Sequence, residues 1–164
     1  MSTYDLIIKR LQAITPFNIY QVNEDGTVEP WYEVTSDQLM NDLVLADRDI
    51  LTQVQTVANQ VAHWGRLEAQ CKRVWDIAER EYRTWRDGMY LQFLRGAEKK
   101  TTQKEIDAMI RTHPSYSLYY NRIERAEEAY NAATAVYKAW SVKKEMIGKA
   151  VYRQKDELGG KLSI

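Results

Sequence analysis

Apolar residues recur in alternating steps of four and three along two long stretches of the chain, here called the first and second seams. Residues at this spacing line one narrow stripe of a helix, and a stripe held in register over several heptads is typical of a coiled coil. The pattern therefore predicts long packed helices. The first seam holds Ile50, Val54, Val57, Val61, Trp64, Glu68, Cys71, Trp75, Ala78, Tyr82, Trp85 and Met89. The second holds Tyr119, Ile123, Ala126, Tyr130, Ala133, Tyr137, Trp140, Lys144, Ile147 and Val151.

The two seams are expected to fold back on each other as an antiparallel helical hairpin. Each seam has one charged member, Glu68 in the first and Lys144 in the second. An opposite-charge pair at one layer would set the register of the hairpin more than it would stabilise it. The alternative is that each charge lies at the rim in water.

Capping signals give the expected start of the first long helix. Thr35 and Gln38 have the spacing of a capping box, and no proline follows until Pro114. We therefore expect one helix over about 36–94, ending at Gly96.

A second capping box, Thr102 with Glu105, begins a short helix to about Arg111. Proline disfavours helix in the residue before it and opens a helix well at the first turn. The final helix is therefore expected to run from about Pro114 to Arg153.

The N-terminal segment has a mixed pattern. A short helix is expected near residues 3–13, and two β-favouring stretches, 17–22 and 27–34, flank the turn-rich Asn-Glu-Asp-Gly at 23–26. This arrangement indicates a β-hairpin, in which Pro30 would confine the second strand to an edge.

We predict an all-α protein that carries a small N-terminal helix and β-hairpin. The expected units are an N-terminal appendage (1–34), a helical hairpin domain (35–158) and a frayed tail (159–164).

Charge is balanced overall but unevenly distributed. Basic and acidic residues both number 23. Acids dominate residues 24–49 and bases dominate residues 138–155. The basic segment 138–155 would suit an anion, or the acidic and basic segments could pair between subunits.

Enzymatic chemistry finds little support in the residues. His63 and His113 lack the Cys or His neighbours that zinc requires, and the glycines within the helical pattern are isolated, so no phosphate-cradling loop is present. Cys71 lies on the first seam, where a cysteine is usually an inert core residue. We expect no catalytic site, no metal and no cofactor.

The lone cysteine also bears on the compartment. One cysteine gives no disulfide framework and suits a reducing cytoplasm. No apolar run reaches the length of a membrane span, and the polar start is unlike a signal peptide, so no membrane partner is expected.

Basic residues provide the main functional lead. Arg66, Arg73 and Arg80 repeat every seven residues and share one side of the first long helix, while Lys138 and Lys149 share a side of the last. Such a stripe can follow a phosphate backbone, with aromatic rings stacking on unpaired bases. The candidate nucleic-acid-binding residues are Arg66, Lys72, Arg73, Arg80, Arg83, Lys138, Lys143, Lys149 and Arg153.

An ordinary solvated helix face would look similar. Acidic residues are interleaved with the arginines of the first long helix. Pairs such as Asp76 with Arg80 and Glu79 with Arg83 would neutralise them within the helix.

Part of the sequence resembles a known family. The run Trp-Gly-Arg-Leu-Glu-Ala-Gln-Cys-Lys-Arg at 64–73, then Ala-Glu-Arg-Glu-Tyr-Arg at 78–83, resembles the first long helix of the phage recombination mediator UvsY and its relatives. Trp-Ser-Val-Lys-Lys-Glu-Met at 140–146 is similar to their later helix. The likeness covers roughly 43–153; the N-terminal segment is longer and more acidic than in the family, and Cys71 stands where a basic residue can precede Lys72.

The resemblance implies a recombination mediator. Such proteins bind single-stranded DNA, form ring-like homo-oligomers and help a recombinase displace single-strand-binding protein, in the host cytoplasm for a phage-encoded chain. The basic pair Lys72 and Arg73 and the later Arg80 and Arg83 match the basic positions of the family.

Two other functions fit the same residues. A phage scaffold or assembly chaperone would use the helical hairpin to bind protein helices, with no affinity for a nucleic acid strand. A virus-encoded inhibitor would hold a host protein through the acidic N-terminal region. Strand binding separates the first hypothesis from these two.

Overall fold

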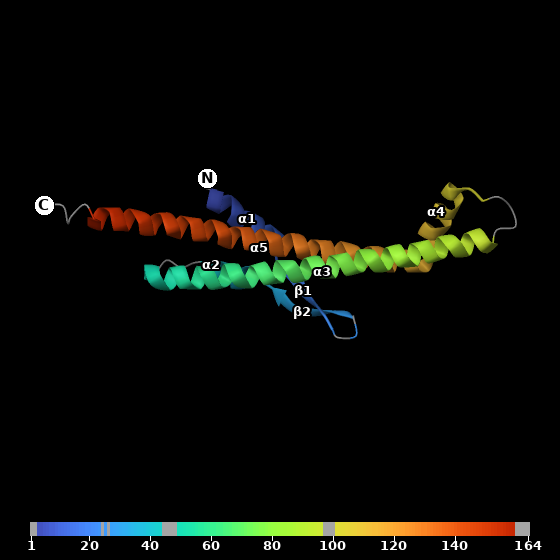
Figure 1. The fold of residues 1–164 in the computed structure, drawn as a ribbon, viewed down its shortest axis with the longest axis horizontal. Helices are drawn as coiled ribbons and strands as arrows, with labels where there is room; N and C mark the ends of the chain where they lie inside the picture. Colours follow the sequence, from blue (N-terminus) through green and yellow to red (C-terminus); the bar gives the residue numbers. More distant parts are fainter. Residues whose placement is uncertain (1–2, 24, 26, 44–48, 97–100, 160–164) are drawn as a thin grey trace.

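The computed structural model describes residues 3–23, 25, 27–43, 49–96 and 101–159 (Figure 1). It is mainly α-helical with one two-stranded antiparallel sheet, so the predicted fold class is confirmed. The elements in chain order are α1 (Thr3–Ile14), β1 (Phe17–Val22), β2 (Val28–Val34), α2 (Ser36–Leu43), α3 (Ile50–Gly96), α4 (Gln103–Thr112) and α5 (Pro114–Gly159).

Helices α3 and α5 lie side by side and run in opposite directions over most of their length (Figure 1). Aromatic rings of the two seams meet between them. The Trp75 and Tyr130 rings stack with centroids 5.6 Å apart, and those of Trp85 and Tyr119 stack at 5.0 Å. Because large rings bury much apolar area in preferred offset geometries, these contacts hold the hairpin together.

Of the two alternatives for Glu68 and Lys144, the paired layer is wrong. The Thr134 hydroxyl donates a hydrogen bond to Glu68 Oε1 at 2.8 Å, and the Lys144 side chain is exposed. Lys144 lies ten residues beyond Thr134, which places it ~15 Å further along α5. The register is set by the ring contacts between the helices, and these align Glu68 with Thr134.

The prediction of a single helix over 36–94 is also wrong, because the structure has two helices, α2 and α3, in this range. Thr35 and Gln38 form the predicted reciprocal cap at the start of α2, which ends at Leu43. A new cap begins α3, since the Asp49 carboxylate accepts hydrogen bonds from the Thr52 N–H (3.0 Å) and hydroxyl. An Asp that caps in this way starts a helix of its own.

Most of the other helix ends agree with expectation. Helix α3 ends at Gly96 as predicted, and Thr102 with Glu105 forms the complete capping box of α4. Helix α5 begins at Pro114 but continues beyond the predicted end at Arg153. Of the tail predicted over 159–164, all but Gly159 lies outside the described residues.

The predicted N-terminal helix and β-hairpin are confirmed, and they pack across the α3–α5 pair. Leu11 of α1 and Ile19 of β1 are fully buried in the same apolar cluster as Trp64 and Trp140. The Gln70 amide donates a 2.6 Å hydrogen bond to the backbone oxygen of Tyr20. The N-terminal segment therefore shares the core of the long helices.

This packing buries residues that lie off the two seams. On α3 they are Leu67 and Val74; on α5 they are mainly small residues, Ala129, Ala132, Val136 and Ala139. Small side chains on α5 let α1 and β1 approach the helix closely. Each long helix thus has a wider apolar face than a two-helix seam requires.

The β-hairpin contains an irregularity. Ile19 pairs with Tyr32 and the next residue, Tyr20, pairs with Pro30, so Trp31 has no partner on β1. One extra residue on one strand is a β-bulge, which twists the strand and changes the direction of its side chains.

Candidate nucleic-acid interface

The arginine stripe, consisting of Arg66, Arg73 and Arg80, lies on the outer face of α3. Each arginine follows a buried seam residue (Trp64, Cys71 or Ala78) by two positions, a rotation of about 200° around the helix axis. All three side chains are exposed. Within the described part of the chain, none of the three guanidinium groups forms an ion pair. The stripe is therefore open to an anionic ligand.

Two other predicted site residues are already neutralised by neighbours. The Lys72 ammonium lies 2.7 Å from an Asp76 oxygen and 4.1 Å from the centre of the Trp75 ring. The hydrogen bond with Asp76 raises the pKa of Lys72. Arg83 pairs with Glu79 at 2.8 Å, as the solvated-face interpretation predicted, whereas the predicted Asp76–Arg80 pair is wrong because the Asp76 carboxylate is bound to Lys72.

The basic residues of α5 are staggered relative to the stripe. Gly65 lies against the Tyr137 ring, so Arg66 and Lys138 are at one level of the hairpin. Lys149 and Arg153, both exposed, lie a further ~16–22 Å along α5, away from Arg80. Lys143 is partly buried and has a lowered pKa because burial disfavours its charge. The nine predicted residues therefore do not form one compact site.

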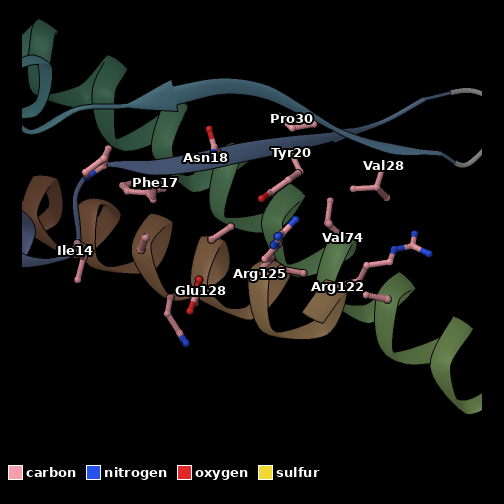
Figure 2. A pocket seen from close by; sticks show the side chains of 16 residues that line it. Ile14, Phe17, Asn18, Tyr20, Val28, Pro30, Val74, Arg122, Arg125 and Glu128 are labelled. Carbon is pink, nitrogen blue, oxygen red and sulfur yellow. The ribbon is translucent and has the colours of Figure 1, made fainter. Parts of the chain in front are cut away.

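A groove of about 810 Å³ lies between the β-hairpin and the long helices (Figure 2). Tyr20 of β1 and Val74 of α3 line it, together with Arg122 and Arg125 of α5 (Figure 2). The positive charge of Arg122 is partly neutralised, since its guanidinium group pairs with Glu81 of α3 at 2.8 Å. This groove joins residues far apart in the sequence, and no local pattern indicated it.

A second groove, of about 1000 Å³, lies beside the arginine stripe and is here called the Trp31 groove. Arg66 belongs to both. The walls come from β2, α2 and α3 and carry mostly polar side chains. They are Trp31, Tyr32, Val34, Gln38, Leu39, Asn41, Asp42, Asn59, Gln60, Ala62, His63, Trp64 and Arg66.

Two titratable side chains near the core, Cys71 and Tyr32, have raised pKa values that keep them neutral. Burial, with a further contribution from the Glu68 charge, raises the pKa of the Cys71 thiol to about 11. Burial likewise raises the pKa of Tyr32 to about 12. Because the reactive form of cysteine is the thiolate, Cys71 is an unreactive core residue at neutral pH.

The described ranges contain no group of three or more His, Cys, Asp or Glu side chains that could hold a metal ion. No helix in these ranges combines the length and apolar character needed to cross a membrane.

Fold and surface define this chain as a mainly α-helical hairpin protein with an exposed arginine stripe. Comparison with protein-family models, curated proteins and solved structures found no match.

Proposed function

We propose that this protein is a non-enzymatic recombination mediator that binds single-stranded DNA as a homo-oligomer in the host cytoplasm. Its partners in this role are a phage recombinase and single-strand-binding protein. The observation that carries the proposal is the arginine stripe, three exposed guanidinium groups at seven-residue spacing on one face of α3.

The stripe suits a flexible phosphate backbone. Successive arginines are ~10 Å apart along the helix, so Arg66 to Arg80 extends over ~21 Å. Each phosphate contact releases counterions, which makes affinity fall as salt rises. The chain has no net charge. Attraction therefore depends on this local face and not on the field of the whole molecule.

The test is fluorescence anisotropy of a labelled oligothymidine at low and near-physiological salt, with a duplex of equal length as competitor. Wild-type protein should prefer the single strand, and Arg73→Ala and Arg80→Ala should each weaken binding and reduce the salt slope by about 0.7. Arg10→Ala is the matched control, because it removes one exposed positive charge from α1, which packs against α5. Equal losses in all three variants, or no binding at low salt, would contradict the proposal.

A second candidate function is a phage scaffold or assembly chaperone. Apolar side chains are exposed at the end of the hairpin where α3 begins, among them Leu51 (66% exposed) and Tyr152 (72%). Contiguous exposed apolar surface is typical of protein-binding sites. Under this alternative the wild-type protein binds no strand even at low salt.

A further inference from the structure

The Trp31 groove has an aromatic wall created by the β-bulge. Neighbouring residues of a regular strand point to opposite faces of the sheet. At the bulge, however, the rings of Trp31 and Tyr32 contact each other edge to face with centroids 5.0 Å apart, and both line the groove. Tyr32 is partly buried, while Trp31 is half exposed (50%). Trp31 therefore offers a half-exposed ring that contacts Tyr32.

The walls formed by α2 and α3 carry hydrogen-bonding groups. Asn41 of α2 and Asn59 and Gln60 of α3, each with a side-chain amide, line the groove. None of the three amides forms a hydrogen bond with another residue that the structure describes. An amide both donates and accepts, so these groups can match the polar edge of a planar heterocycle.

The charges of the groove are arranged unevenly. Arg66 lines it on the side of the arginine stripe, and Asp42 lines it from α2. A carboxylate repels phosphate but accepts hydrogen bonds from the amino group of a base, as aspartate and glutamate do with cytosine. The interior therefore favours a neutral polar ring, with the phosphates remaining at Arg66.

We infer that the Trp31 groove holds an unpaired nucleobase of a single strand that follows the arginine stripe, with the base stacked on Trp31 and its edge facing the amides. This inference rests on the proposed function and adds a base-binding position to it. Stacking on an aromatic ring is how proteins bind unpaired bases with little sequence preference, since every base has a π-face. Arg66 connects the two parts, because it belongs to both the stripe and the groove.

The experiment compares two labelled strands of equal length, an oligothymidine and an abasic strand with the same phosphates. Wild-type protein should bind oligothymidine more tightly. Trp31→Ala should weaken oligothymidine binding about tenfold and leave abasic binding unchanged. Trp31→Phe should restore most of the loss because it keeps an aromatic face. Tyr120→Ala is the matched control, a similarly exposed ring (46%) on α5, and should behave as wild type.

The outcomes separate this inference from the proposed function. If Trp31→Ala binds oligothymidine as wild type does while Arg73→Ala binds weakly, the base position is overturned and strand binding survives. Equal weakening of Trp31→Ala on both strands also overturns it, because the loss is then independent of bases. Failure of wild-type protein to bind either strand at low salt overturns both proposals. Thermal melts of every variant establish that each is folded.

Discussion

At the scale of single residues, rotation around the α3 axis decides whether a side chain belongs to the core or to the surface. Cys71 is 2% exposed and Arg73, two positions later, faces water. The buried thiol packs within the main apolar cluster, and its neutral form is the one that burial favours. The same rotation places the arginine stripe in water, where none of its guanidinium groups forms an ion pair with a residue that the structure describes.

Burial of Cys71 predicts a loss of stability in alkali. The thiol has a folded-state pKa of about 11, raised from its ordinary value of 9.0. Below pH 9 it is protonated in both states and its contribution is fully present. Between pH 9 and 11 the unfolded chain loses the proton first, so the free energy of unfolding falls. The pKa of Tyr32 is raised to about 12 from 10.0, so ionisation of Tyr32 lowers the free energy of unfolding in the same way above pH 10.

Urea denaturation at pH 8 and pH 10.5 checks this expectation. Between these two pH values, the free energy of unfolding of the wild-type protein should fall by about 2 kcal/mol more than that of Cys71→Ala. The variant is the control because it keeps every other titrating group. Parallel losses in the two proteins would show that Cys71 ionises as easily in the folded chain as in the unfolded one.

At the scale of elements, the small residues of α5 determine how the N-terminal segment packs. Ala139 is fully buried in the cluster that also holds Leu11 of α1 and Ile19 of β1. A close-packed face of this kind accepts no additional volume without movement of the backbone or side chains.

Enlarging a buried alanine of α5 should therefore destabilise the protein. Ala139→Leu is expected to lower the free energy of unfolding by about 1–3 kcal/mol through overpacking. Ala150→Leu is the matched control, since Ala150 is exposed on the same helix and leucine is also a good helix former. Chemical denaturation of both variants measures the difference. An unchanged free energy of unfolding in Ala139→Leu would contradict close packing at this position.

At the scale of the whole molecule, each seam has a central part inside the hairpin and an exposed end. Their central parts meet inside the hairpin, as in the Trp75–Tyr130 contact. Seam positions at the end where α3 begins stay exposed, including Val54 (40%) and Val151 (36%). The apolar pattern thus continues past the internal contact. This exposed end is where we place the interface of the proposed homo-oligomer.

Charges at this end should weaken self-association. The double variant Leu51→Glu, Tyr152→Glu replaces two exposed apolar side chains and should sediment as a smaller species than wild type over the same concentration range. Leu6→Glu is the control, an exposed leucine (57%) on α1. Circular dichroism should give equal helix content for all three. Unchanged sedimentation of the double variant would remove this end from the interface.

Much of the architecture follows from local sequence patterns. Heptad spacing identified both long helices, and capping residues located the starts of α2 and α4, because these signals depend on neighbours within a few residues. The same kind of signal was present for α3, where Asp49 caps the helix by accepting a hydrogen bond from the Thr52 N–H, although the uninterrupted helical pattern concealed it. Seven-residue spacing likewise identified the arginine stripe, since periodicity specifies which face of a helix a residue occupies.

Other features depend on which element covers each face. Leu67 and Val74 are buried because β1 and the rest of the N-terminal segment pack beside α5, and no spacing within α3 indicates that second partner. The alignment of Glu68 with Thr134 results from ring contacts between distant segments. The Trp31 groove requires a bulge whose position is determined by pairing with β1. Periodicity alone thus established the apolar and charged faces of each helix, while tertiary contacts decided the register, the second buried face and the groove, because these arise only between elements remote in the chain.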